Sequence, residues 1–366
     1  MPPRITTLST LHHYLYVAMQ IEHATIPPYL MAMYSIHPGT NSDAVHILRV
    51  VVVEEMLHLT LAANLLNAVN GKPDLTTPDF VPEYPAGLPN GEEDFVVDLQ
   101  PFSWDAVQNF LEIERREPPP SSEPRMIRRR PIRHSFVARP LQPDPDLHYC
   151  TIGDFYEEIR LGIEYLYAQN PSGLFTGNPD KQIGPEYYYS GGGRLLEVTN
   201  IGTAREAIRI IVEQGEGFGG GIFNEENELA HFYRFEQLQL GRYYEPGNTP
   251  GQASGPPLEV DWNAVYPVAK NPKLKHYQND PELFAAAGAF NADYARFLAL
   301  LTRAYNGERQ LLTLEAVPAM FKFRDRMNQL IRNPIPGSEY TKNAGPTFEM
   351  PGAAAAAQPA ATSEAA

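Results

Sequence analysis

The chain has 366 residues, of which 43 % are hydrophobic and 20 % are charged, and its formal net charge at pH 7 is −15. This composition excludes a wholly disordered chain and argues against a protein that binds nucleic acid through a basic surface. The single cysteine, Cys150, excludes an intramolecular disulfide and a multi-cysteine metal site. No targeting pattern is visible, and charged residues interrupt the most apolar stretch, 44–69. We therefore expect a cytoplasmic protein that binds neither membranes nor nucleic acid.

Helical periodicity predicts a mainly α protein. Apolar residues recur at helical spacing in seven segments: 9–34, 43–69, 151–167, 203–214, 225–240, 281–305 and 309–331. The segment 71–146 contains 14 of the 35 prolines, which predicts an extended, turn-rich insertion. We expect a single domain over 1–332, with capping helices in 281–332, and an extended, largely disordered tail over 333–366.

The helix predicted over 43–69 carries the most informative pattern. It is apolar on every side, yet Glu54, Glu55 and His58 lie in its middle. A buried carboxylate is costly unless it is protonated, paired or bound to a metal ion. Glu55 and His58 are three residues apart, so they project from one side of the helix and can bind one ion. In di-iron carboxylate bundles, two helices each supply such a Glu-x-x-His pair and two others each supply a glutamate.

Glu22 is the expected partner of this pair from the first helix. It lies in an apolar stripe, and an antiparallel hairpin brings it level with Glu55. Pro27 and Pro28 follow within two turns, so we expect them to distort the helix and to free backbone carbonyls near the site.

The second half of the site can be built in two ways. In the first, Glu213 comes from the helix over 203–214, and the second Glu-x-x-His pair, Glu228 with His231, comes from the helix over 225–240. In the second, the residues are Asp154 or Glu158 with Glu213 and Glu216. We favour the first because it repeats the arrangement of the first half and gives His231 a role. The predicted metal ligands are therefore Glu22, Glu55, His58, Glu213, Glu228 and His231.

Five longer motifs extend this pattern: IEHATIPPYL at 21–30, VVEEMLHL at 52–59, IVEQGEG at 211–217, ELAHFYRFE at 228–236 and GPTFE at 345–349. Together they resemble the ferritin-like domain of the iminophenyl-pyruvate dimer synthase family, which occurs in biosynthesis of the violacein and rebeccamycin type. The resemblance runs from about residue 11 to residue 349. It implies a ferritin-like helical bundle and oxidative chemistry on amino-acid-derived imines or related small metabolites. It supports five of the six predicted ligands most directly, namely Glu22, Glu55, His58, Glu213 and His231.

We therefore expect a non-haem iron enzyme, an oxidase or oxygenase of secondary metabolism. Carboxylate and imidazole ligands with open positions suit iron and O2 chemistry. We expect one or two iron ions, with manganese or another metal as the alternative, and a small-molecule substrate and O2 as partners; a homo-oligomer stays open. The alternative function is a ferritin-like protein that binds metal or a partner without turnover. The arginines between Arg125 and Arg139 form a basic island, which we expect to be an exposed loop or a subunit contact.

Overall fold

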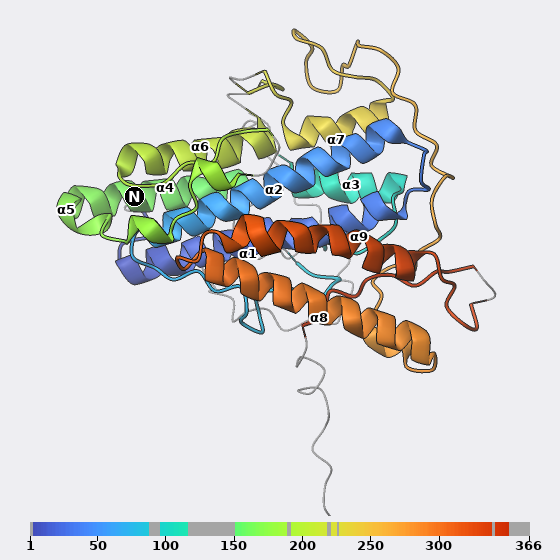
Figure 1. Ribbon diagram of the computed structural model, residues 1–366. Helices are drawn as coiled ribbons and strands as arrows, with labels where there is room; N and C mark the ends of the chain where they lie inside the picture. The colour runs from blue at the N-terminus through green and yellow to red at the C-terminus, as the bar shows by residue number, and fades with distance from the viewer. Residues whose placement is uncertain are drawn as a thin grey trace, which may run out of the picture.

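The computed structural model describes residues 3–87, 96–115, 151–188, 192–217, 221–224, 227–338 and 341–350. Within these ranges the chain is helical, with isolated β-bridges and no β-strand (Figure 1). The α-helices are α1 Leu8–Ser35, α2 Ser42–Ala68, α3 Trp104–Ile113, α4 Ile152–Gln169, α5 Pro171–Leu174, α6 Ile201–Glu216, α7 His231–Leu240, α8 Pro281–Ala304 and α9 Val317–Ile331. Short 3₁₀ turns are η1 Pro179–Lys181, η2 Pro185–Tyr187 and η3 Leu274–Tyr277, and a π-helical turn, η4 Leu312–Ala316, precedes α9.

The long helices α1 and α2 form an antiparallel hairpin at the centre of the molecule. The hydroxyl of Thr7 caps α1 by accepting a hydrogen bond from the backbone N–H of Thr10, 3.1 Å away. The helix continues through Pro27 and Pro28. Because Pro28 has no N–H, the carbonyl of Ala24 loses its helical donor, and the hydroxyl of Tyr84 donates to it instead, at 2.7 Å. The freed carbonyl expected from the sequence is therefore present, and a side chain satisfies it.

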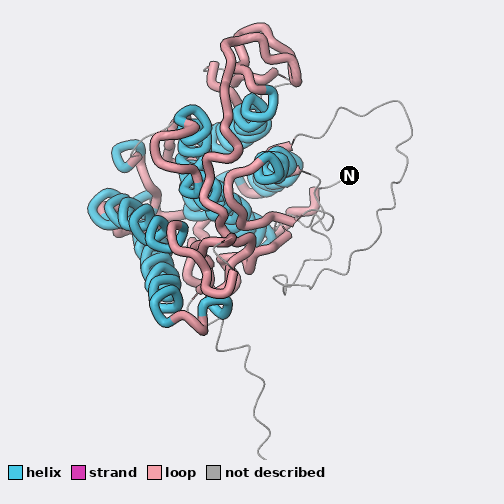
Figure 2. The backbone as a smooth tube through the Cα atoms, turned by 90° about the vertical axis from the view of Figure 1, so that its right-hand side faces the viewer, coloured by secondary structure: helices cyan, strands magenta, loops and turns pink. Residues whose placement is uncertain are grey.

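Helices pack against both sides of this hairpin. One side contacts α4, α6 and α7, and α3 packs on α7; the other side is covered by α8 and α9 (Figures 1 and 2). Most buried apolar side chains of the described residues belong to one continuous core, which the two helices of the hairpin cross from end to end. No described helix is both long enough and apolar enough to span a membrane.

Most of the predicted helices agree with the structure. The five expected over 9–34, 43–69, 151–167, 203–214 and 281–305 match α1, α2, α4, α6 and α8 within two residues at each end. The helix predicted from residue 225 is wrong at its start, because α7 begins at His231. Asn227 has a positive φ of 59° and Ala230 is extended, so the chain before His231 is not helical.

Two regions differ from a simple reading of the proline-rich segments. The insertion predicted over 71–146 contains α3, whose N-terminus is capped by the hydroxyl of Ser103. In the predicted tail, residues 341–350 pack on the bundle: Phe348 is 2 % exposed, and the Tyr277 hydroxyl donates to the Gly345 carbonyl at 3.0 Å. The basic island from Arg125 to Arg139 and the tail after residue 350 lie outside the described residues.

Candidate metal centre

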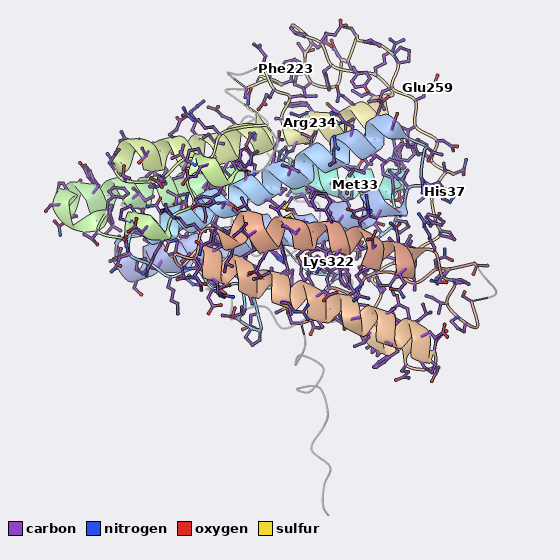
Figure 3. All side chains as sticks on the ribbon, in the orientation of Figure 1. Met33, His37, Phe223, Arg234, Glu259 and Lys322 are labelled. Atoms are coloured by element: carbon purple, nitrogen blue, oxygen red, sulfur yellow. The ribbon has the colours of Figure 1, made fainter. Side chains whose placement is uncertain are left out.

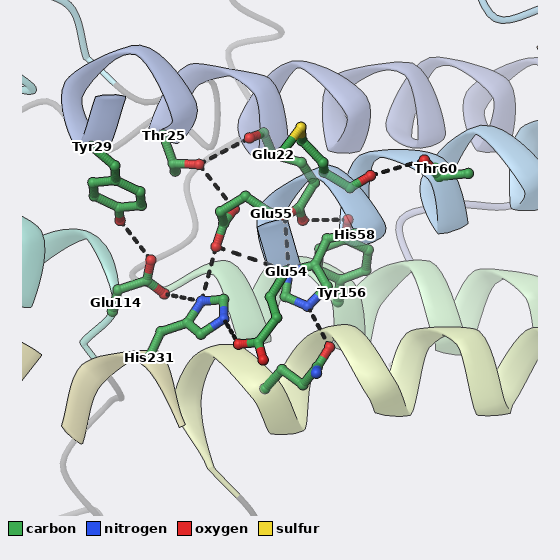
Figure 4. Close-up of polar contacts among 12 residues, drawn as sticks. Glu22, Thr25, Tyr29, Glu54, Glu55, His58, Thr60, Glu114, Tyr156 and His231 are labelled. Atoms are coloured by element: carbon green, nitrogen blue, oxygen red, sulfur yellow. Dashed lines mark hydrogen bonds and ion pairs between the residues drawn. The ribbon is translucent and has the colours of Figure 1, made fainter. Parts of the chain in front are cut away.

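Four of the six predicted ligands meet inside the bundle, where the α1–α2 hairpin faces α6 and α7 (Figure 4). Glu22 comes from α1, Glu55 and His58 from α2, and His231 is the first residue of α7. His231 is 0 % exposed and the other three residues are no more than 3 % exposed. These four residues are therefore largely shielded from bulk water, as their apolar surroundings in the sequence predict.

The first group of metal-binding side chains consists of Glu22, Glu55 and His58. The Nδ1 atom of His58 lies 3.4 Å from Oε2 of Glu22 and 3.9 Å from Oε1 of Glu55. The three atoms that these side chains offer all lie within 4.8 Å of one another. This spacing is compatible with a single ion bound between them.

The second group consists of Glu55, Glu114 and His231, and Glu55 is common to both groups. The Nδ1 atom of His231 lies 2.9 Å from Oε1 of Glu55 and 3.6 Å from Oε2 of Glu114. The rings of His58 and His231 are stacked with their centroids 5.4 Å apart. The two groups therefore adjoin each other, and Glu55 lies between the two imidazoles.

Each imidazole is oriented by a hydrogen bond at Nε2, the ring nitrogen that points away from the carboxylates of the two groups. The Nε2 atom of His58 lies 3.0 Å from Oε1 of Gln214, and Nε2 of His231 lies 2.9 Å from Oε2 of Glu54. Because these oxygens only accept hydrogen bonds, Nε2 carries a proton in each ring. Nδ1 of each ring therefore faces the carboxylates, where it could bind a metal ion once its proton is lost.

Each of the three carboxylates is also held by a hydroxyl. Tyr156 donates to Oε1 of Glu22 and Tyr29 donates to Oε1 of Glu114, both at 2.6 Å, and the Thr25 hydroxyl lies 2.9 Å from Oε2 of Glu55 and from the backbone carbonyl of Glu22, between which its one proton is shared (Figure 4). Each hydroxyl takes one oxygen and leaves the other directed at an imidazole. The carboxylates are thus oriented before any ligand binds.

The clustered carboxylates shift the pKa values of the side chains at the site. Burial and the neighbouring Glu114 together raise the pKa of Glu55 to about 7. Burial alone lowers the pKa of His58, but the carboxylates of Glu22 and Glu55 raise it above its ordinary value. The pKa of His231 is raised well above its ordinary value, against the effect of burial, by Glu114, Glu54 and Glu55. The carboxylates therefore favour any cation at this position, whether a proton or a metal ion.

Nδ1 of His231 and Oε1 of Glu55 lie 2.9 Å apart. A lone pair and a carboxylate oxygen at this distance repel each other, so a proton or a metal ion must lie between them. The donor set, three carboxylates and two imidazoles in an apolar interior, fits a metal ion.

Two predicted ligands lie outside both groups. Oε2 of Glu213 accepts a hydrogen bond from Nη1 of Arg209, one turn earlier on α6, at 2.6 Å. Glu228 precedes α7, and its carboxylate accepts from the side-chain amide of Asn224 at 3.3 Å. Because residues 227–230 are not helical, Glu228 and His231 do not form a helical Glu-x-x-His pair.

The alternative ligands, Asp154, Glu158 and Glu216, also lie outside both groups. Asp154 is exposed, and Glu158 accepts a hydrogen bond from the backbone N–H of Arg4. Glu216 lies closer, at the edge of a cavity of about 20 Å³ that is also lined by Glu22, Glu55 and Glu114. Its Oε1 accepts from the backbone N–H of Gly153 at 2.7 Å.

Sequence reasoning missed Glu114, which follows the last residue of α3 and is 4 % exposed. The abundant prolines around α3 predict extended structure, so the helix was not expected there. A local signal was available: Ser103 is a good N-cap, and Val107, Phe110 and Leu111 follow at helical spacing. Reading this short helix would have placed an acid at the end of an apolar face.

A helical bundle that holds carboxylates and imidazoles in its core is the arrangement of ferritin-like proteins. The chain belongs to the Ferritin-like family, whose model matches residues 15–240. A crystal structure of a ferritin-like protein from Caulobacter vibrioides superposes with a TM-score of 0.58, covering 94 % of this chain and 99 % of the other at 21 % identity. The predicted ferritin-like bundle is therefore confirmed.

The chain is also 25 % identical over 322 residues to dichlorochromopyrrolate synthase from Lentzea aerocolonigenes. The match covers 81 % of this chain and 29 % of the synthase, so the chain spans less than a third of that protein's length. The predicted resemblance to the ferritin-like domain of a synthase family is confirmed by these matches.

Replacing Gln214 with leucine is expected to lower the affinity for a bound metal ion about tenfold to a hundredfold. The change leaves the Nε2–H of His58 without its acceptor and frees the ring to change tautomer. Titration of the metal-free protein with Mn²⁺ measures the effect. Gln237→Leu is the matched control, because Gln237 is also 4 % exposed but accepts from the backbone N–H of Tyr244 instead. Equal affinities in the two variants would show that Gln214 does not support a ligand.

Proposed function

We propose that this protein is a non-haem iron oxidoreductase that uses O2 to oxidise a small, amino-acid-derived metabolite. The observation that carries the proposal is the pair of Glu/His groups sharing Glu55. Each group offers three ligand atoms, which leaves coordination positions free for O2 and substrate. The similarity to dichlorochromopyrrolate synthase supports a role in making a small organic compound.

We assign five ligands to two iron ions. Glu22 and His58 would bind one ion, Glu114 and His231 the other, and Glu55 would bridge them. Bound iron supplies the one-electron and O2 chemistry that protein side chains lack. Compared with the set expected from the sequence, Glu114 takes the place of Glu213 and Glu228.

The remaining residues at the centre would orient ligands and exclude water. Gln214 and Glu54 fix the tautomers of the two imidazoles, and Tyr156 and Tyr29 fix two carboxylates. Ile113, Ile152, Ile211 and Val212 make the wall of the adjoining cavity apolar. Its volume of about 20 Å³ has room for one water-sized molecule such as O2. An organic substrate would therefore approach from outside this cavity, past Gly215 and Glu216.

Anaerobic loading with Fe²⁺ followed by exposure to O2 tests this function. We expect two iron ions per chain, and O2 uptake that rises when imines of aromatic amino acids are added as candidate substrates. Less than about a tenth of an equivalent of bound iron would overturn the proposal. Iron binding without substrate-dependent O2 uptake across such compounds would instead support a metal-binding protein without turnover.

A further inference from the structure

A second cavity, of about 180 Å³, lies between the α1–α2 hairpin and the helices α8 and α9. On α2 its lining includes Arg49, Val53 and Thr60. With 3.6 residues per turn, these three side chains project about 120° or more around the helix axis from Glu55 and His58. The backbone of α2 therefore separates this cavity from the candidate metal centre, and a molecule bound here would not reach the metal ligands.

The walls of this cavity are suited to an aromatic molecule. Three methionines contribute flexible, polarisable side chains, and Phe297 and Phe323 contribute ring faces; the methionines are Met33, Met56 and Met320. An engineered apolar cavity of about 150 Å³ is large enough to bind benzene, so the space here accommodates one or two rings. Met33 and Lys322, labelled in Figure 3, mark the hairpin and α9 on the two sides of this region.

A buried polar pair lies in the wall of the cavity. The Nε2 atom of His23 is 2.6 Å from the hydroxyl of Tyr294, and these side chains are 2 % and 4 % exposed. The Nδ1 atom of His23 has no hydrogen-bond partner among the described residues. If the tyrosine hydroxyl donates to Nε2, then Nδ1 carries the unused N–H and the hydroxyl oxygen has an unused lone pair. If Nε2 donates to the tyrosine, then Nδ1 has the unused lone pair and the hydroxyl has the unused O–H. In either case the pair has one unused donor and one unused acceptor.

The other polar pair in this wall has no donor left. The Thr60 hydroxyl donates to the carbonyl of Met56 at 2.8 Å, so the Tyr305 hydroxyl, 3.0 Å away, donates to Thr60. Tyr34 and Arg49 also line the cavity but are half-buried and exposed, so the buried part of the lining offers hydrogen bonds to a ligand through His23 and Tyr294. A buried polar group without a partner costs free energy, which a ligand that supplies the partner recovers.

Charge in the lining is confined to the mouth of the cavity. Arg49 is exposed there, beside the half-buried Leu30 and Val53, and none of the described lining residues is a carboxylate. Moving a charged group into the apolar interior would be costly. The cavity therefore favours an uncharged ligand that enters past Arg49.

We propose that this cavity binds an uncharged aromatic molecule of one or two rings that carries a hydroxyl or ring N–H, which hydrogen-bonds to the Tyr294 hydroxyl of this pair. The site is separate from the candidate metal centre and does not depend on the function proposed for it. A ring alone would gain only the apolar contacts. A phenol-like ligand would also make a hydrogen bond to the Tyr294 hydroxyl.

Fluorine NMR titration of the full chain with 4-fluorophenol and 4-fluorotoluene tests the proposal, because these compounds differ only in the hydroxyl. We expect the phenol to bind about tenfold more tightly, the value of one well-made buried hydrogen bond. Tyr294→Phe should remove most of this difference and leave the affinity for the toluene unchanged. Tyr277→Phe is the matched control: it removes another buried hydroxyl, bonded to Gly345 and outside this cavity, and both affinities should stay as in the wild type.

A second variant tests whether the compounds bind in this cavity, and it leaves His23 and Tyr294 unchanged. Met320→Trp fills the space from α9, remote from the metal ligands, and should abolish binding of both compounds while metal content is unchanged. The proposal is overturned if neither compound binds, if the two bind equally well, or if Met320→Trp leaves binding intact. The wild-type comparison and Met320→Trp keep the test decisive if Tyr294→Phe does not fold.

Discussion

Replacing Glu55 with alanine is expected to abolish metal binding at both positions of the candidate centre. Glu55 is the one side chain of the described residues that belongs to both groups, and its Oε1 faces His58 at 3.9 Å and His231 at 2.9 Å. Its loss removes a ligand from each ion and the bridge between them. Metal analysis after anaerobic Fe²⁺ loading and desalting measures the result: two ions per chain in the wild type and close to none in the variant.

Thermal unfolding gives a second readout of the same change. A ligand that binds only the folded state raises its stability, by about 2.7 kcal/mol when the free ligand is a hundredfold above its Kd. The wild-type protein should therefore unfold at a higher temperature with Fe²⁺ than without it, and Glu55→Ala should show no such increase. A variant that still gains stability from Fe²⁺ would contradict the assignment of Glu55.

Glu213→Ala is the matched control for this experiment. Glu213 was predicted as a ligand from the sequence and is also buried, at 6 % exposure, but its carboxylate pairs with Arg209. The variant should lose some stability, because it leaves Arg209 without this partner, and it should keep its metal content. If Glu213→Ala lost the metal and Glu55→Ala kept it, the ligand set read from the geometry would be wrong.

The part of the site carried by the long hairpin could be predicted from sequence for a physical reason. Acids in an apolar helix that is buried on all sides must be satisfied inside the protein, so Glu22, Glu55 and His58 were conspicuous. The hairpin is also local in sequence, with a short connection between α1 and α2, which fixes its antiparallel register. Burial and register together were enough to place these three side chains.

The second half of the site depends on contacts that are distant in sequence. His231 was identified from the sequence. Its three-residue spacing from Glu228 does not place the two side chains on one helix face, because α7 begins at His231. On α6, Arg209 lies one turn before Glu213 and takes its carboxylate, and the next residue, Gln214, reaches His58 instead. Glu114 reaches the centre from a short helix within the proline-rich insertion, and the packing of α3 on α7 and α1 brings it there.

Replacing Glu114 with alanine is expected to remove one of the two ions and retain the other. Glu114 belongs only to the group with His231, so Glu22, Glu55 and His58 keep a complete set of three ligands. Iron content should fall from two ions per chain to one. With Mn²⁺ in place of iron, electron paramagnetic resonance should change from the spectrum of a coupled pair to that of an isolated ion.

Tyr29→Phe distinguishes the loss of the Glu114 carboxylate from the loss of the hydrogen bond that orients it. The Tyr29 hydroxyl donates to Oε1 of Glu114 at 2.6 Å, so this variant frees the carboxylate without removing it. We expect both Mn²⁺ ions to remain at saturation, with weaker binding of the second by about tenfold to a hundredfold, the usual effect of losing a group that orients a ligand. A coupled spectrum in Glu114→Ala would exclude Glu114 as a ligand. An isolated-ion spectrum in the wild type would show that Glu55 does not bridge two metals.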